Sequence, residues 1–73
     1  MARFYWLGPA SSISHCGICH EPIKNIFIYG LTQRSKTWMV CCPYCHARLG
    51  KGLGFDVGQE YHKEADGRFS QVL

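Results

Sequence analysis

Apolar residues are concentrated in two short runs near the middle of the chain. Residues 25–29 combine β-branched and aromatic side chains and end at Gly30, and residues 37–41 form a second run of the same kind. Such runs are typical of β-strands. The predominantly polar and basic residues 31–36 between them predict an antiparallel hairpin with a long, exposed tip.

A helix signal follows the second run. Pro43 is of the type favoured at the first position of a helix, and residues 44–49 allow about one and a half further turns. We expect Gly50 to end this helix in the left-handed conformation. The sequence therefore predicts one short helix directly after the second strand.

The C-terminal part of the chain predicts a second hairpin. Residues 59–62 and 68–72 have strand-like patterns, and Asp66 and Gly67 between them are typical turn residues. Together with the first hairpin and the helix, this hairpin completes a small α+β pattern.

The start of the chain carries an aromatic cluster. Phe4, Tyr5 and Trp6 precede a Gly-Pro turn signal. No partner strand for this cluster is evident in the pattern. We therefore expect residues 1–14 to form an N-terminal aromatic arm, and residues 15–73 to form a single four-cysteine zinc-binding domain.

The length of the chain limits the stability that a hydrophobic core can supply. With 73 residues and a mass of 8.3 kDa, the chain forms one domain at most, and its core alone is barely sufficient. Nothing at the N-terminus resembles a secretory signal, and the apolar runs are too short to span a membrane. We therefore expect a monomeric cytoplasmic protein whose cysteines bind metal instead of forming disulfides.

Four of the five cysteines form two Cys-x-x-Cys pairs with the spacing of a zinc site. Cys16 and Cys19 form the first pair, Cys42 and Cys45 form the second, and the 22 residues 20–41 separate them. Two residues between cysteines let both sulfurs face one point, so two pairs complete a tetrahedron of thiolates around one Zn²⁺ ion. Such a closed site makes the zinc structural and argues against an enzyme.

The remaining cysteine leaves one ligand position open to alternatives. Cys41 is close enough to replace Cys42, but strand alternation places it on the face of Met39, which favours a buried side chain beside the site. The histidines that flank the two pairs are further alternative ligands. They are His15, His20 and His46.

Two zinc-stabilised architectures fit two β-hairpins and one short helix. In a zinc ribbon both cysteine pairs lie at hairpin ends, whereas in a treble clef the second pair begins a helix. Pro43 and Gly50 favour the treble-clef-like form. Around the zinc hairpins we expect Phe27, Trp38 and Phe69 in the core.

The aromatic residues are too many and too large for so small a core. They make up 14% of the chain, and the net charge of +3 is a mild basic bias without acidic residues between Glu21 and Asp56. Aromatic rings beside basic side chains suit a protein interface or weak contact with nucleic acid. The candidate partner-binding residues are Phe4, Tyr5, Trp6, Arg34, Lys36, Arg48 and Lys51.

The motifs resemble those of small zinc-finger proteins of tailed bacteriophages. The resemblance covers roughly residues 16–70 and includes the first cysteine pair. Its most specific part is Trp38-x-x-x-Cys42-Pro43-x-Cys45-His46, then Gly50-x-Gly52-Leu53-Gly54-x-x-x-Gly58-Gln59-x-Tyr61 and Asp66-Gly67-Arg68-Phe69.

In length and zinc-finger organisation, the chain is also similar to a small transcription regulator of a lytic phage. This similarity implies that the chain binds host RNA polymerase, inhibits σ-dependent initiation and promotes antitermination. The alternatives are a stand-alone nucleic-acid-binding zinc ribbon and a structural adaptor in a phage complex.

Overall fold

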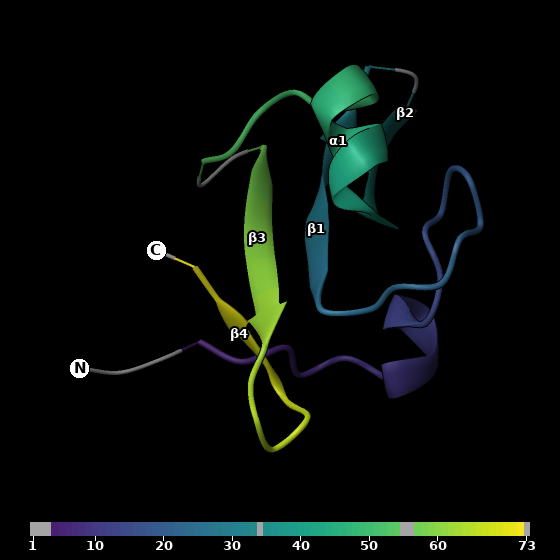
Figure 1. Ribbon diagram of the computed structural model, residues 1–73. Helices are drawn as coiled ribbons and strands as arrows, with labels where there is room; N and C mark the ends of the chain where they lie inside the picture. Colours follow the sequence, from purple (N-terminus) through teal and green to yellow (C-terminus); the bar gives the residue numbers. More distant parts are fainter. Residues whose placement is uncertain (1–3, 34, 55–56, 73) are drawn as a thin grey trace.

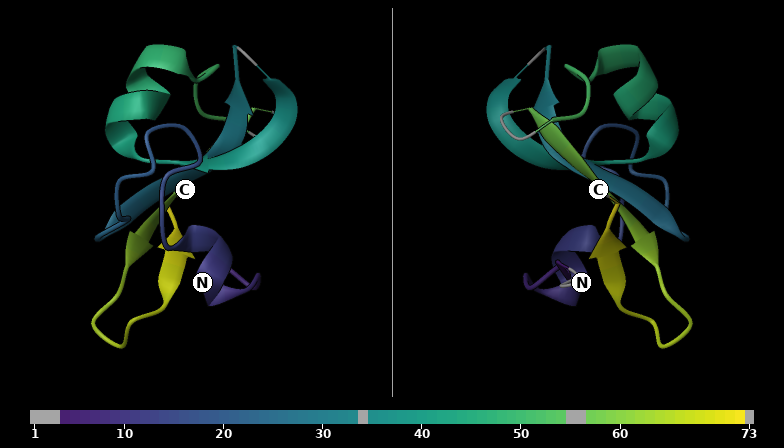
Figure 2. Two further views of the ribbon diagram at one scale, coloured as in Figure 1. Left: turned by 90° about the vertical axis from the view of Figure 1, so that its right-hand side faces the viewer. Right: turned by 90° about the vertical axis from the view of Figure 1, so that its left-hand side faces the viewer.

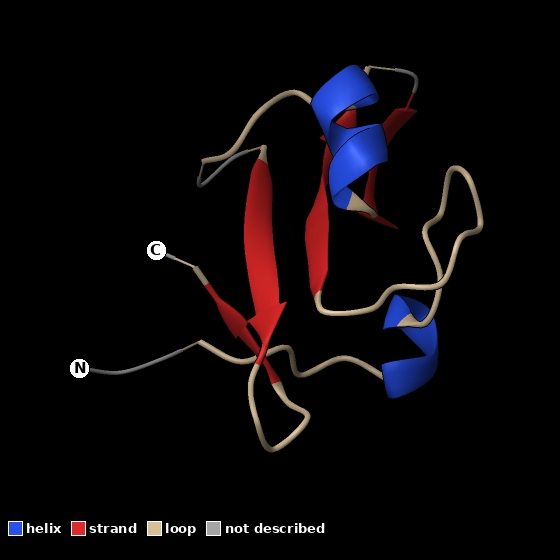
Figure 3. Cartoon of the chain, in the orientation of Figure 1, coloured by secondary structure: helices blue, strands red, loops and turns tan. Residues whose placement is uncertain are grey.

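The computed structural model describes residues 4–33, 35–54 and 57–72, which form a small α+β fold (Figure 1). The elements in chain order are the 3₁₀ helix η1 (Ala10–Ile13), strands β1 (Ile26–Thr32) and β2 (Ser35–Cys41), helix α1 (Pro43–Leu49), and strands β3 (Gly58–Lys63) and β4 (Phe69–Gln71). The strands form one antiparallel sheet in the order β2-β1-β3-β4 (Figure 3). Both predicted hairpins are therefore present, and the pairing of β1 with β3 joins them.

The first hairpin has a shorter turn than the sequence pattern predicts. Thr32 pairs with Ser35, and the register shifts between Gly30 and Thr32. The expected tip is too long because Leu31 and Thr32 belong to the sheet and Leu31 has partners from distant parts of the chain, whereas Gln33 in the turn is exposed as expected. The Leu31 N–H donates to the Val57 carbonyl at 2.8 Å, and Thr32 is only 2% exposed.

Helix α1 occupies the predicted residues, but the glycine after it acts differently from expectation. Gly50 has φ −73° and ψ 162°, which is extended backbone, so the predicted left-handed stop is wrong. A Cβ atom at Gly50 would lie 2.3 Å from the His46 ring. Gly50 therefore lacks a side chain because it packs closely against His46, not because its backbone is left-handed.

The aromatic core lies on one face of the sheet. Phe27 is fully buried and stacks on Tyr61, with ring centroids 4.9 Å apart. Phe69 and Trp6 pack edge-on against Phe27, with centroids 5.0 Å and 5.4 Å away. The prediction for Phe27 and Phe69 is confirmed, and rings from β1, β3, β4 and the N-terminal segment share one cluster.

Trp38 extends this aromatic packing toward the outer strand β2. It is half-buried, and its ring centroid lies 5.3 Å from that of Tyr29. Tyr29 in turn contacts Trp6 at 5.1 Å. Trp38 thus borders the core that we expected it to occupy.

The N-terminal aromatic segment has a partner strand, contrary to the expectation from sequence. Tyr5 forms an antiparallel bridge with Ser70 in β4, and the Trp6 N–H donates to the Phe69 carbonyl at 2.9 Å. The segment covers the outer edge of β4, where an unpaired strand would expose its backbone groups. A pairing this short has too few residues to produce a recognisable strand pattern.

Helix α1 packs against β1 and β2, so it covers part of the sheet (Figure 2). Ile28 and Cys41 alternate with the core residues Phe27 and Val40, so their side chains point to the face opposite the aromatic core. Both are buried. Neither helix in the described residues is long and apolar enough to cross a membrane.

Candidate metal centre

Four cysteines from two separate segments converge beside the sheet. Cys16 and Cys19 lie in the turn between η1 and β1, Cys42 directly precedes α1, and Cys45 lies within α1. Their four sulfur atoms lie within 4.8 Å of one another. The structure therefore brings together the two Cys-x-x-Cys pairs in an arrangement that can hold a metal ion.

Backbone hydrogen bonds shape the first pair and attach it to the sheet. The Ile18 N–H lies 3.3 Å from the Cys16 sulfur and points to it as a donor. The Cys16 N–H donates to the Glu21 carbonyl at 2.9 Å, which closes the turn. The Gly17 N–H donates to the Val40 carbonyl at 2.7 Å, so the turn is held against the outer edge of β2.

The second pair is positioned by the start of α1. Cys42 is the N-cap residue, and its sulfur accepts a hydrogen bond from the Cys45 N–H at 3.4 Å. Pro43 at the first helical position has a backbone φ that suits a helix. One helical turn therefore directs both sulfurs toward the first pair.

Electrostatics in the cluster favour a bound cation. Burial opposes ionisation of Cys16, but hydrogen bonds from backbone N–H groups outweigh it and lower the pKa of this thiol to about 6. Burial and the neighbouring cysteine sulfurs raise the pKa of Cys45 to about 12. Four thiols this close do not all ionise without a compensating positive charge, which a divalent metal supplies.

Cys41 lies beside the cluster but outside it. Its side chain is fully buried, and its sulfur is 3.8 Å from the Met39 carbonyl oxygen. Burial, with a smaller contribution from the nearby cysteines, raises the pKa of the Cys41 thiol to about 11. This placement agrees with the strand alternation that distinguished Cys41 from Cys42.

The three histidines that flank the pairs also lie outside the cluster. His15 is exposed, and its Nδ1 is 3.0 Å from the Ser14 hydroxyl. His46 is half-buried, and its Nε2 is 3.2 Å from the Gly52 carbonyl oxygen. His20 is exposed and has a left-handed backbone, with φ 64°.

The proposed partner-binding aromatic residues have different environments. Trp6 belongs to the core, so its expected place in a surface arm is wrong. Phe4 is 57% exposed. The Arg68 guanidinium lies over the Tyr5 ring, 4.2 Å from its centroid.

The proposed basic residues lie elsewhere, around the first hairpin and α1. Arg34 is outside the described residues, and of Lys36 only the backbone, in β2, is described. Arg48 is exposed, and its guanidinium lies 5.4 Å from the ring centroid of Tyr44, which is 67% exposed. Sequence reasoning missed Tyr44 as a surface aromatic residue, although its i, i+4 spacing to Arg48 on a helix indicates this contact.

Lys51 is exposed just beyond α1, and its N–H donates to the Leu31 carbonyl at 3.3 Å. The basic group around α1 and the aromatic segment beside β4 lie at opposite ends of the molecule (Figure 1). The sequence-predicted partner-binding residues are therefore not brought together into one surface.

The fold and site define a small α+β domain with a four-cysteine cluster that can hold a metal ion such as zinc. Comparison with protein-family models, curated proteins and solved structures finds no match for this chain.

Proposed function

We propose that the cysteine cluster holds one structural zinc ion and that the domain is a treble-clef-like binding module, not an enzyme. The geometry of the four sulfurs carries this proposal. Two thiolates on one tetrahedral zinc, each about 2.3 Å from the metal, lie about 3.8 Å apart. The Cys19 and Cys42 sulfurs, one from each pair, are 3.8 Å apart.

The arrangement of the two pairs supports the treble-clef form. The first pair lies in a turn, and the second pair begins α1. Four thiolates occupy every position of a tetrahedral ion, so no site is left for a substrate or a reactive water. The zinc would therefore supply folding free energy, roughly 10–16 kcal/mol for small domains of this kind.

The proposed partner of the module is host RNA polymerase, with inhibition of σ-dependent initiation and promotion of antitermination as the result. The similarity in length and zinc-finger organisation to a small transcription regulator of a lytic phage supports this partner. The exposed Tyr44–Arg48 pair adds support, because aromatic and arginine side chains are enriched among interface anchors.

Affinity capture from host cells tests this partner. The zinc-loaded, tagged chain is expected to retain RNA polymerase subunits, and it should lower σ-dependent transcription and increase terminator readthrough with purified polymerase. A Tyr44→Ser, Arg48→Ser variant should capture less, whereas Lys63→Ser on β3 is the exposed control. Capture that contains no polymerase subunit would disprove the partner.

Direct nucleic-acid binding is a second candidate, and the Tyr44 ring beside Arg48 and Lys51 favours it. An exposed ring can stack on a base while the cations contact phosphates. With two phosphate contacts, affinity for a single-stranded oligonucleotide should fall about sevenfold between 50 and 200 mM salt. Absence of binding at the lower salt concentration rules this candidate out.

A further inference from the structure

The four cysteines of the cluster differ in how open they are to solvent. Cys16 is fully buried and Cys45 is only 2% exposed, whereas Cys42 is half-buried and Cys19 is exposed. Reactive cysteines in proteins are partly exposed, and buried structural cysteines are inert. Cys19 is therefore the ligand position at which a reagent from solvent reaches the cluster.

Apolar packing explains this difference. Cys16 and Cys45 belong to a group of buried side chains against which Met39 of β2 packs. Cys19 is outside that group and lies in the turn whose next residue, His20, is also exposed. The cluster is thus closed on the side of β2 and open at the turn that holds Cys19.

A bound metal determines the chemical state of the exposed sulfur. Cysteine binds zinc as the thiolate, so in the zinc-bound domain Cys19 is deprotonated. An exposed thiolate is the form of cysteine that is most readily oxidised. Cys41 is the contrasting case, because it is fully buried and lies outside the cluster. Exposure and ionisation therefore coincide most fully at Cys19.

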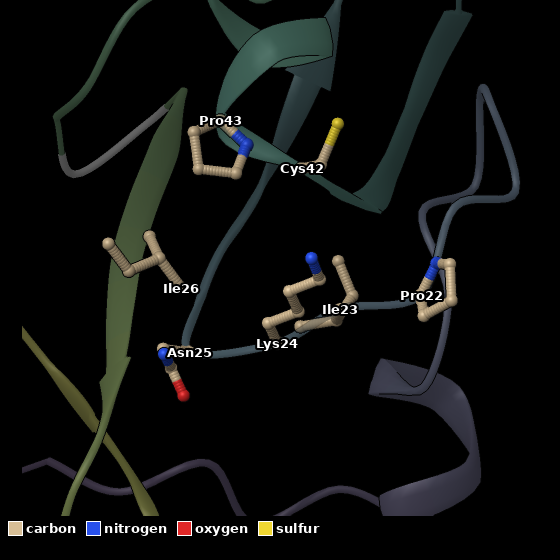
Figure 4. Close-up of a pocket in the computed structure, with 7 residues that line it drawn as sticks. All are labelled: Pro22, Ile23, Lys24, Asn25, Ile26, Cys42 and Pro43. Carbon is tan, nitrogen blue, oxygen red and sulfur yellow. The ribbon is translucent and has the colours of Figure 1, made fainter.

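A second sulfur lies close enough to complete an oxidation. The Cys42 sulfur is 3.8 Å from that of Cys19, and a disulfide bond is about 2 Å long, so the two sulfurs must approach by about 1.8 Å. Cys42 and Pro43 form one side of an open pocket of about 330 Å³, and residues 22–26 form the other side (Figure 4). The space beside Cys42 leaves room for this movement.

We propose that Cys19 is a modification site at which a hydroperoxide oxidises the cysteine cluster and releases its metal ion. The Cys19 thiolate attacks the O–O bond of hydrogen peroxide, which leaves a sulfenic acid on Cys19 and expels hydroxide. The Cys42 thiolate then attacks the sulfenic sulfur, which forms the Cys19–Cys42 disulfide and expels a second hydroxide. The two thiolates lose two electrons in total, and the peroxide gains them.

The disulfide removes two of the four ligands, so the zinc ion is no longer held. Because folding depends on the metal, oxidation unfolds the domain, and reduction by a thiol in the presence of zinc restores it. This inference rests on the proposed zinc site, to which it adds control by oxidants.

Limited labelling of the zinc-loaded, full chain tests the order of access. With a limiting amount of N-ethylmaleimide, mass-spectrometric mapping should find at least about fivefold more label on Cys19 than on Cys16 or Cys45, because maleimide reacts with exposed thiolates. In a separate sample, hydrogen peroxide in small molar excess should release zinc, measured with a coloured chelator. Mapping of the oxidised chain should find Cys19 joined to Cys42, and dithiothreitol with zinc should reverse the release.

Two variants separate Cys19 from the other cysteines. Cys19→His keeps a side chain that binds zinc but removes the exposed sulfur, so its zinc-loaded form should lose metal at least about tenfold more slowly in peroxide. Cys41→Ala removes the buried cysteine outside the cluster and should change the release rate less than about twofold. If Cys19→His binds no zinc, the labelling order in the unsubstituted chain decides.

Four results would overturn the proposal: label first on Cys16 or Cys45, zinc release without oxidation of Cys19, equally fast release by Cys19→His, or a zinc-loaded chain that keeps its metal in peroxide. The last result would leave the structural zinc site intact and reject only its sensitivity to oxidants. A purified chain that binds no zinc would reject the zinc site and this inference together.

Discussion

Serine substitutions at the adjacent residues Cys41 and Cys42 separate metal binding from packing. Serine removes one thiolate from the cluster at Cys42 but can still cap α1, because serine is a preferred N-cap residue. A loss of structure in Cys42→Ser would therefore come from the metal site. Zinc binding of roughly 10–16 kcal/mol is comparable with the total stability of a domain, so this variant should not fold at micromolar zinc.

Cys41→Ser should have a smaller and different effect. Cys41 is fully buried, and the Met39 carbonyl oxygen, 3.8 Å from its sulfur, is too far for a normal O–H···O hydrogen bond. A buried, unsatisfied hydroxyl costs about 1–3 kcal/mol, and 1 kcal/mol corresponds to about 4–8 °C in Tm for a domain of this size. The variant should melt lower and still bind one zinc.

Elemental analysis and thermal unfolding by circular dichroism, at one fixed concentration of total zinc, measure both effects. Cys41→Ala is the matched control, because it leaves no buried hydroxyl and should also retain one zinc. If Cys41→Ser loses zinc and Cys42→Ser retains it, the assignment of the ligands is reversed. If both variants retain zinc with unchanged affinity, the four-cysteine site itself is refuted.

Three further substitutions test the packing around the site. Gly50→Ala should lower the free energy of unfolding by about 1–3 kcal/mol in urea titrations, because its Cβ would lie 2.3 Å from the His46 ring; an unchanged midpoint would contradict this contact. Trp6→Ala should cost about 3–5 kcal/mol, whereas Leu7→Ala, at a residue 93% exposed, should change stability by less than about 0.5 kcal/mol; equal effects would place Trp6 outside the core. Burial raises the pKa of Tyr61, so the folded protein favours the neutral phenol. The stability that the neutral phenol contributes is present below the unfolded pKa near 10 and is lost as pH rises through the folded pKa. Tyr61→Phe should therefore lose less stability than wild type between pH 8 and pH 11.

The features that were predicted correctly depend on neighbouring residues in the chain. Cysteine pairs with two intervening residues turn locally, and Pro43 starts a helix through its own backbone geometry. Alternation along one strand was enough to separate the buried Cys41 from the cluster that contains Cys42. The turn at Gly67, with φ 92°, follows in the same way from local backbone preference.

The features that were predicted incorrectly depend on contacts between distant segments. No residue pattern around Trp6 indicates that its backbone pairs with β4, more than sixty residues later in the chain. Leu31 was expected in an exposed tip because the pattern around it does not reveal its hydrogen-bond partner, Val57, which lies in the connection between α1 and β3. Gly50 ends α1 as expected, but its extended backbone was not predicted, because the position of the nearby His46 ring does not follow from local pattern alone.

The sequence by itself determined that this is a small α+β chain with four cysteines in two Cys-x-x-Cys pairs whose spacing can hold a metal ion, since turn, helix and ligand spacing act over a few residues. Tertiary structure decided that the two hairpins form one sheet, that Trp6 is core, and that the candidate surface residues occupy opposite ends of the molecule. It also decided that β2 pairs with β1 only as far as Cys41, which lies opposite Ile28. These outcomes depend on which distant backbone groups and rings pair with one another, and residue spacing alone does not specify those pairs.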